Sequence, residues 1–296
     1  MAENVTICEM APRDGMQAVN RSMRIPFEMR LELVRTLMRA RLPYVEVGSF
    51  VSPKVMPHME DTPRLFGQLD ASNYAGQLAA LVPNERKYER FGDTPNMTTV
   101  AIFVSASEAY SQKNKSVGID EDLAHAWQIA QMAWARGHRL RAHLSAAFRD
   151  PLGAQAETDP RVVARVSREL IEIGCETVAL ADTDGRATPR DLQRTIAHLL
   201  DSHVDVARLG VHLHDRAGHA IDNAAIAYRL GVRTFDGAAG GIGGNRTLED
   251  AVGNVATESL VELFQRMDVE TGIDPNVLRD ALRLVREMLQ LVGDDA

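Results

Sequence analysis

Short apolar segments alternate with amphipathic segments along the whole chain, and this alternation constrains the fold more than any other feature. Helical periodicity fills the intervals between eight strand-like segments. The expected strands are Val5–Glu9, Tyr44–Gly48, Gln77–Val82, Thr99–Ser105, Leu140–Ser145, Thr177–Ala181, Gly210–His214 and Thr234–Gly237. Eight strands that alternate with helices predict an α/β fold, the closed (β/α)8 TIM barrel.

The helical segments agree with this prediction. The expected helices include Pro26–Ala40, Leu123–Arg136, Arg161–Ile173 and Pro189–Leu200, and a further C-terminal helical segment, Asp274–Leu291. We expect the C-terminal segment to pack outside the barrel. A doubly wound open sheet is the competing architecture, but the first strand is not followed by a Gly-x-Gly-x-x-Gly turn. Because no Ser/Gly-rich linker or tandem repeat interrupts the chain, we expect one domain over residues 1–296.

Charge and cysteine content argue against several classes of protein. The chain has 296 residues, of which 45% are hydrophobic, and a formal net charge of −8. We expect no nucleic-acid partner, because general nucleic-acid binding needs a basic surface. We also expect no signal peptide and no membrane span, since no apolar run is long enough. The two cysteines, Cys8 and Cys175, are too few for a disulfide scaffold, so a cytoplasmic location is expected.

His212 and His214 are separated by one residue within the seventh expected strand. Side chains at i and i+2 of a strand point to the same face, and two neutral imidazoles on one face suit a divalent metal. A pair of core histidines bonded to the backbone is the alternative, and it is favoured for an isolated His-x-His. Asp14, in a turn after the first strand, could add a carboxylate ligand. Arg13 beside it could stabilise an anionic oxygen, although a surface ion pair is the alternative for these two residues.

Polar residues recur at the carboxyl ends of the expected strands, which is where active sites of such barrels lie. They are Arg13 and Asp14 after the first strand, Glu46 near the end of the second, Arg141 and His143 on the fifth, Asp182 after the sixth, and His212 and His214 at the end of the seventh. Each has a structural alternative, such as an internal ion pair or a turn cap. Their recurrence at the same end of successive strands favours a catalytic metal site.

Several stretches of the chain match one known family. They are Pro12–Gln17, Glu46–Lys54, Ser105–Glu108 with Lys113 and Asn114, Leu180–Thr183, Val211–Asp215 and Gly253–Glu258. On these residues, and over almost its full length, the chain resembles the 3-hydroxy-3-methylglutaryl-coenzyme A (HMG-CoA) lyase family of metal-dependent lyase and aldolase barrels.

The resemblance implies a divalent metal ion, Mg or Mn, as cofactor. The implied ligands are Asp14, His212, His214 and Asn254. Arg13 would stabilise the enolate oxygen. Glu46 and Asp182 would handle protons or orient other catalytic groups, so that the implied catalytic residues are Arg13, Asp14, Glu46 and Asp182.

The resemblance also implies a substrate and a reaction. Gln17, Arg141, Ser49 and Asn245 are the candidate substrate-binding residues. The implied reaction is a retro-aldol cleavage of a 3-hydroxyacyl substrate, expected to be a coenzyme A (CoA) thioester. The family suggests a homodimer.

Asn245 departs from the family, which has a cysteine there that is regarded as a proton donor. An amide has no useful acid–base pKa near neutrality, so we expect an altered substrate or another proton donor. Residues 18–20 and 146–149 also depart from the family, and we expect all three stretches to line the substrate mouth. Two alternatives stay open. One is an aldol or Claisen-type relative that acts on 2-oxo acids. The other is a catalytically silent binding protein derived from a lyase.

Overall fold

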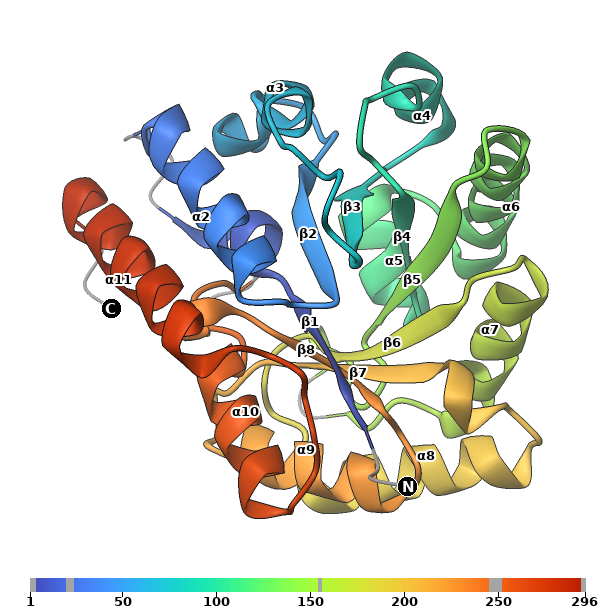
Figure 1. The fold of residues 1–296 in the computed structure, drawn as a ribbon. Coiled ribbons are helices and arrows are strands. Elements are labelled where there is room, and N and C mark those ends of the chain that lie inside the picture. The colour runs from blue at the N-terminus through green and yellow to red at the C-terminus, as the bar shows by residue number, and fades with distance from the viewer. Residues whose placement is uncertain (1–3, 20–23, 154–155, 245–251, 294–296) are drawn as a thin grey trace.

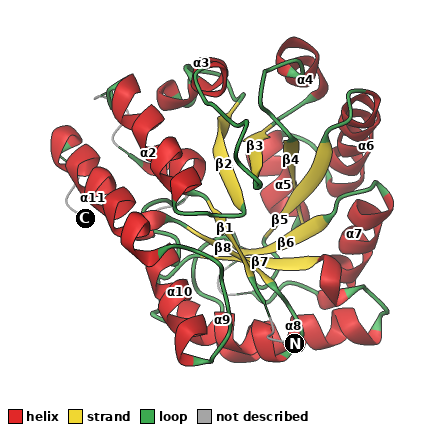
Figure 2. Cartoon of the chain, viewed as in Figure 1, coloured by secondary structure: helices red, strands yellow, loops and turns green. Residues whose placement is uncertain are grey.

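The strands form a closed parallel barrel, which confirms the predicted fold class (Figures 1 and 2). The computed structural model describes residues 4–19, 24–153, 156–244 and 252–293. Each strand pairs in parallel with the next, and β8 pairs with β1 to close the barrel. The strands are β1 (Thr6–Glu9), β2 (Tyr44–Ser49), β3 (Gln77–Leu81), β4 (Thr99–Ser105), β5 (Arg139–Ser145), β6 (Thr177–Asp182), β7 (Leu209–Leu213) and β8 (Thr234–Gly237).

Helices surround the barrel on the outside (Figure 1). They are α2 (Phe27–Arg39), α3 (Thr62–Gly67), α4 (Glu85–Phe91), α5 (Glu108–Lys115), α6 (Ile119–Ala135), α7 (Pro160–Glu172), α8 (Pro189–Asp201), α9 (Ala220–Arg229), α10 (Thr257–Arg266) and α11 (Pro275–Val292). Short helical turns are η1 (Ala11–Gly15), α1 (Met16–Ala18), η2 (Pro57–Met59), η3 (Val206–Arg208) and η4 (Ala239–Gly241). The C-terminal helix α11 lies beside α2, outside the barrel, as predicted.

Helix α6 begins at Ile119, four residues before the expected start at Leu123. Its first turn holds three acidic residues, and negative charge there interacts favourably with the helix dipole. The Glu108 carboxylate also accepts a hydrogen bond from Ile119 N at 3.0 Å, which satisfies one backbone donor of that turn. The apolar periodicity alone did not reveal this polar first turn.

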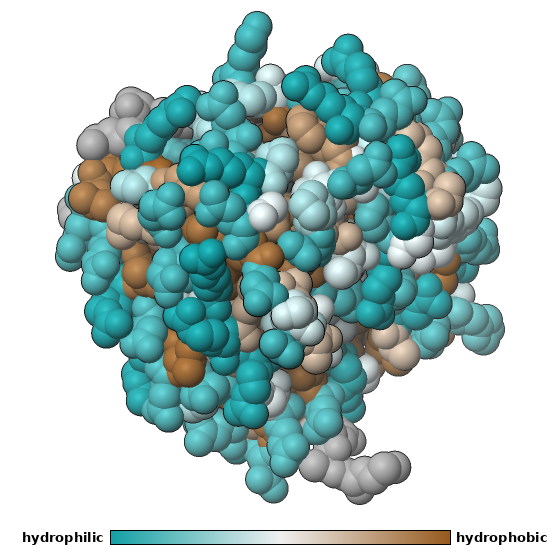
Figure 3. Space-filling view, turned by 45° about the horizontal axis from the view of Figure 1, so that its top comes forward, coloured by the Kyte–Doolittle hydropathy of each residue, from teal (hydrophilic) through white to brown (hydrophobic). Residues whose placement is uncertain are grey.

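The apolar core lies between the strands and the helices, whereas polar side chains lie inside the barrel. Cys8, Met10, Tyr44 and Ala79 form a buried cluster that is separate from the main core. The visible face of the molecule is mostly hydrophilic, with hydrophobic residues in small, separate patches (Figure 3). None of the described helices is both long and apolar enough to cross a membrane.

Candidate active site

A single turn of π-helix, η1, carries Arg13 and Asp14 directly after β1. Such turns are rare and occur frequently at functional sites. Arg13 Nη1 contacts Asp14 Oδ1 at 2.6 Å, so the two side chains are fixed against each other. A Cβ atom at Gly15 would lie 2.6 Å from the Ile242 side chain. Glycine at this position therefore allows η1 to approach the loop after β8 closely.

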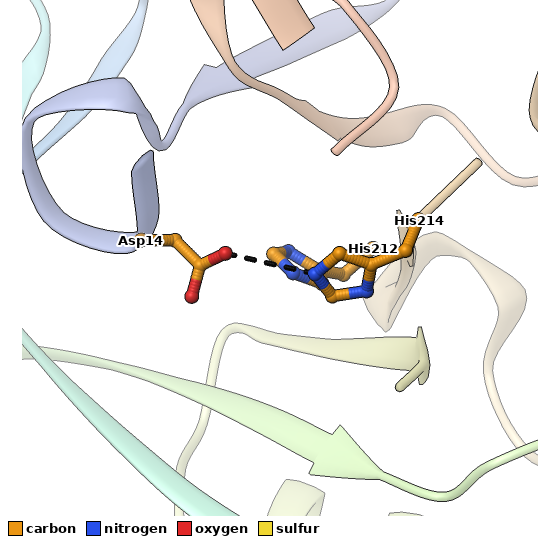
Figure 4. A group of neighbouring side chains, drawn as sticks. All are labelled: Asp14, His212 and His214. Carbon is orange, nitrogen blue, oxygen red and sulfur yellow. Dashed lines mark ion pairs between the residues drawn. The ribbon is translucent and has the colours of Figure 1, made fainter. Parts of the chain in front are cut away.

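Asp14, His212 and His214 converge at the carboxyl end of the barrel (Figure 4). Their candidate ligand atoms all lie within 4.8 Å of one another, and His214 Nε2 is 3.6 Å from Asp14 Oδ2. Burial opposes ionisation of Asp14, but the charges of Arg13 and of both histidines hold its pKa well below its usual range. The carboxylate is therefore ionised at neutral pH, which is the form that binds a metal.

The Nδ1 atom of each imidazole contacts an oxygen atom that orients the ring. His212 Nδ1 lies 3.1 Å from Asp236 Oδ2, and His214 Nδ1 lies 2.9 Å from the Asp182 carbonyl oxygen. The other ring nitrogen of His214, Nε2, is buried and has no hydrogen-bond partner among the described residues. Metal-binding histidines have this arrangement, with one nitrogen held by an outer group and the other directed at the ion. The donor set therefore fits a divalent metal.

Asn254 joins this group from the segment before α10. Its Nδ2 atom donates to Asp14 Oδ2 at 2.9 Å and to the Ile242 carbonyl at 2.8 Å. The backbone of Asn254 also forms a bridge with His214. Gly243 has a φ of +131°, and a Cβ atom there would collide with the Asn254 side chain. The glycine-rich run after β8 thus makes room for Asn254 beside Asp14.

A buried network fixes the Arg13 guanidinium. Arg13 Nε donates to Glu46 Oε1 at 2.6 Å, and His143 Nε2 lies 3.0 Å from Glu46 Oε2. Burial disfavours the Glu46 carboxylate, but the charges of Arg13 and His143 outweigh burial and lower its pKa to about 2. An ionised carboxylate that already holds two partners is suited to orienting Arg13. Arg13 Nη2 lies 3.4 Å from His143 Nε2.

The side chains of Asp182 and Arg141 do not belong to this cluster, although the Asp182 carbonyl contacts His214 and Arg141 pairs with the Asp236 that contacts His212. Asp182 Oδ2 accepts a hydrogen bond from Ala187 N at 3.0 Å, in the loop before α8, and burial raises the pKa of Asp182 to about 7. Arg141 forms an ion pair with Asp236 and lies 4.6 Å above the Tyr44 ring. Neither Asp182 nor Arg141 is among the described residues that line the cavity.

Asp236 has contacts that were not predicted from the sequence. It lies on β8, is 2% exposed, and bonds both Arg141 and His212. Burial opposes its ionisation, but Arg141 and His212 hold its pKa well below its usual range. An acidic residue inside the short apolar strand Thr234–Gly237 was the available signal. A strand position that faces a polar barrel interior tolerates such a residue only when partners compensate its charge.

The candidate metal-binding cluster of Asp14, His212 and His214 lies in a cavity of about 640 Å³. Its polar lining includes Arg13, Asp14, Gln17, His143, His212 and His214. Its apolar lining includes Val51, Val55, Met56, Leu81 and Phe103. Four further cationic side chains also line it, those of Arg86, Lys87, Lys113 and Lys115. Gln17 Nε2 is buried without a hydrogen-bond partner among the described residues, so it is a donor available to a ligand.

Two expected pocket elements, Ser49 and residues 146–148, are not among the described residues that line the cavity. Ser49 is buried and its Oγ accepts a hydrogen bond from Val51 N at 3.2 Å, so it shapes the loop after β2. Ala146, Ala147 and Phe148 are fully buried and do not occur among the described cavity-lining residues. The expectation that this stretch lines the substrate mouth is therefore wrong, because Ala147 and Phe148 pack into the apolar core and Arg149 pairs with Asp191. Asn245 lies outside the described residues.

Comparison with known proteins bears on the fold and the family of this chain. The HMGL-like family model matches residues 4–285. The 3-hydroxy-3-isohexenylglutaryl-CoA/hydroxy-methylglutaryl-CoA lyase of Pseudomonas aeruginosa is 35% identical over 281 residues, which cover 95% of this chain and 91% of that protein. The HMG-CoA lyase structure from Brucella melitensis has a TM-score of 0.91 at 32% identity, with 98% of this chain and 100% of that chain covered. An HMG-CoA lyase from Acinetobacter baumannii in complex with coenzyme A and 3-methylmalate has a TM-score of 0.88 at 27% identity, with 99% and 92% covered.

Proposed function

Because this chain belongs to the HMGL-like family and is a carbon–carbon lyase, we propose that it cleaves a 3-hydroxyacyl-CoA thioester by retro-aldol chemistry. We further propose that its preferred acyl group or its proton donor differs from that of HMG-CoA lyases. The observation that carries the proposal is the convergence of Arg13 with Asp14, His212 and His214 at one end of a single cavity.

Four side chains would hold the divalent metal, proposed to be Mg or Mn. They are Asp14, His212, His214 and Asn254. When bound, the metal supplies Lewis acidity that lowers the pKa of the substrate hydroxyl group. Two imidazoles with a carboxylate and an amide offer the mixed nitrogen and oxygen donors that such ions accept.

Arg13 would stabilise the enolate that forms when the carbon–carbon bond breaks. Glu46 holds Arg13 Nε and Asp14 holds Nη1, each at 2.6 Å, so the plane of the guanidinium is fixed. Its Nη2 atom remains beside His143 at the cavity wall. A donor that is already oriented toward the developing negative charge stabilises the transition state without reorganisation. Gln17 would donate its free Nε2–H to a polar group of the substrate.

The cationic side of the cavity supports a CoA thioester as substrate. Arg86, Lys87 and Lys113 line the same cavity as the candidate metal ligands. They give this acidic chain a local positive region, which suits the phosphate groups of a nucleotide. The A. baumannii lyase structure in complex with coenzyme A also supports this substrate class.

The compartment proposed for this activity is the cytoplasm. Both cysteines, Cys8 and Cys175, are unpaired and buried, which is consistent with a reducing compartment.

The test is a cleavage screen of 3-hydroxyacyl-CoA thioesters and free 2-oxo acids. The protein is stripped of metal with a chelator and assayed after addition of Mn, and the products are identified by mass spectrometry. We expect metal-dependent cleavage of a thioester into an acyl-CoA and a ketone or keto acid. Cleavage of free 2-oxo acids alone would favour the aldolase alternative. Metal-dependent thioester binding without turnover would favour a silent binding protein.

Two charge-reversal variants test the placement of the nucleotide. Lys87→Glu and Lys113→Glu should raise KM for the thioester and leave kcat nearly unchanged, because the lost contact is equally strong in the ground state and the transition state. Glu172→Lys on the outer face of α7 is the matched control. Unchanged KM in both cavity variants would contradict the proposed location of the CoA phosphates.

A further inference from the structure

Lys115, the last residue of α5, is a cavity-lining cation that has no part in the function proposed above. Its side chain is only 16% exposed. Nζ donates to the Phe103 carbonyl oxygen at 3.0 Å and to Asp122 Oδ1, and it lies 4.2 Å from the centre of the Phe103 ring. An ammonium group has three N–H donors, so these two acceptors leave one donor without a partner among the described residues. The wall of the cavity therefore holds an ordered donor.

The connection between α5 and α6 fixes the position of this donor. Ser116, directly after α5, has a φ of +63°, in the left-handed region, so the chain turns sharply there. The Glu108 carboxylate accepts a hydrogen bond from Ile119 N at 3.0 Å, which ties the start of α5 to the start of α6. The two helices are thus held together at both sides of the turn, and Lys115 is held against Asp122 of α6.

Asp122 compensates the charge of Lys115, and Glu85 adds negative charge nearby. Asp122 is completely buried, and its Oδ2 atom has no hydrogen-bond partner among the described residues. Burial raises the pKa of Asp122, the charge of Lys115 lowers it, and the charge of Glu85 raises it. Glu85 Oε1 is also buried without a described hydrogen-bond partner. The Lys115–Asp122 pair therefore carries no net charge, and the carboxylate near it is negative.

Phe103 places the donor beside the reacting part of the cavity. Phe103 on β4 aligns with His143 on β5, and both side chains line the cavity. Neighbouring parallel strands lie about 4.8 Å apart. His143 in turn lies 3.4 Å from Nη2 of Arg13, the residue that would stabilise the enolate. The Lys115 ammonium group therefore lies against a direct neighbour of the reaction site, where the acyl chain of a substrate would extend.

We propose that Lys115 selects the acyl chain of the substrate, and that the preferred chain ends in an uncharged oxygen acceptor such as a hydroxyl group. This inference rests on the thioester cleavage proposed above. One N–H donor whose positive charge is already compensated by Asp122 suits a neutral oxygen. A terminal carboxylate would add a further negative charge next to Asp122 and Glu85, and like charges at one site repel. A terminal methyl group would leave the donor without an acceptor.

Three 3-hydroxyacyl-CoA thioesters of equal chain length test this preference. Their acyl chains end in a primary alcohol, a carboxylate or a methyl group. We measure kcat/KM with the Mn-loaded protein, and the Kd of each thioester by calorimetric titration of the metal-free protein. The alcohol should be preferred over each of the others by about 10-fold or more. If the wild type binds the three in this order and cleaves none of them, the proposed reaction is wrong and the inference stands.

Asp122→Asn tests the role of the carboxylate without removing the donor. The amide oxygen can still accept from Lys115, but the charge of Lys115 is no longer compensated. We expect the ratio of kcat/KM for the carboxylate thioester to that for the alcohol thioester to rise by about 10-fold or more. Glu121→Gln, at an exposed position in the same turn of α6, is the matched control and should leave this ratio unchanged. A merely structural role of Asp122 would change stability and not the ratio.

The double variant Lys115→Met/Asp122→Leu removes the pair without leaving a buried charge, and such replacements are often neutral for stability. It should lose the preference for the alcohol over the methyl thioester. The inference is overturned if the wild type prefers the carboxylate thioester or binds none of the three, or if Asp122→Asn leaves the ranking unchanged. An equal loss for all three thioesters in the double variant would also overturn it, because Lys115 would then contact the part that they share, the coenzyme.

Discussion

We expect the protein to become more stable when the negative charge of Glu9 is removed. Its carboxylate lies at the end of β1 and is completely buried. Oε1 accepts hydrogen bonds from Ala11 N at 2.8 Å and Ala239 N at 2.9 Å, and Oε2 accepts one from Thr257 Oγ1 at 2.8 Å. Glu9 thus joins the segments that carry Asp14 and Asn254. Burial dominates these hydrogen bonds and raises the pKa of Glu9 from 4.5 to about 7.

The sign of the pH dependence follows from this shift. Between pH 4.5 and about 7, the folded protein keeps a proton on Glu9 that the unfolded chain has released. The contribution of Glu9 to the free energy of unfolding therefore decreases as the pH rises from 4.5 to about 7. Each pH unit corresponds to about 1.4 kcal/mol, so the loss is roughly 3 kcal/mol by pH 8.

Glu9→Gln should remove this loss. The glutamine Oε1 can keep both backbone N–H donors, and its amide group can donate to the Thr257 hydroxyl instead of accepting from it. At pH 5 the free energy of unfolding of the variant should equal that of the wild type. At pH 8 it should exceed the wild-type value by up to about 3 kcal/mol. The measurement is urea denaturation at both pH values, with a chelator present so that metal binding does not contribute.

A second variant separates charge from hydrogen bonding. Glu9→Leu leaves Ala11 N and Ala239 N buried without an acceptor, at a cost of about 1–3 kcal/mol each. It should therefore be less stable than Glu9→Gln at both pH values. The reasoning is refuted if Glu9→Gln changes the free energy of unfolding equally at pH 5 and pH 8.

Further predictions concern the site itself. Arg13→Lys should lower kcat by about 100- to 1,000-fold in steady-state assays, since a point charge does not reproduce the guanidinium fork, and near-normal kcat would make Arg13 structural. Asp236→Asn should weaken Mn affinity in calorimetric titrations by about 10- to 100-fold through misorientation of His212, whereas unchanged affinity would contradict that role. His212→Ala should weaken Mn binding more than Asp236→Asn does. Asn245→Cys should increase HMG-CoA cleavage, and high wild-type activity that the substitution leaves unchanged would refute a redirected substrate.

Local pattern was sufficient to predict the strands, several of the helices and which side chains share a strand face. His212 and His214 share a face because strand geometry alone dictates it. The strand–helix alternation predicted the barrel because each amphipathic segment must cover an apolar strand. The placement of Arg13 and Asp14 after β1 followed from the same reasoning, because barrel strands gather their carboxyl ends at one mouth.

Side-chain direction around the closed barrel was not accessible from local pattern. Asp182 and Asp236 are both acidic residues at or near strand ends, and only Asp182 was predicted from the sequence to have a role in the site. In the barrel, His212 aligns with Ala181 and with Asp236, whereas Asp182 aligns with Leu213. Asp236 therefore shares the inward face with His212, and the Asp182 side chain turns out toward Ala187.

The sequence by itself determined the strands, their order and the residues at their carboxyl ends, because these depend on periodicities of a few residues. The tertiary structure alone decided which of those residues meet. Asn254 donates a hydrogen bond of 2.9 Å to Asp14, although the two residues are 240 positions apart in the sequence. Arg141 contacts Asp236, which is 95 positions away. Such contacts depend on barrel closure and on the register between strands, where a shift of one residue reverses every side chain. No local pattern encodes that register.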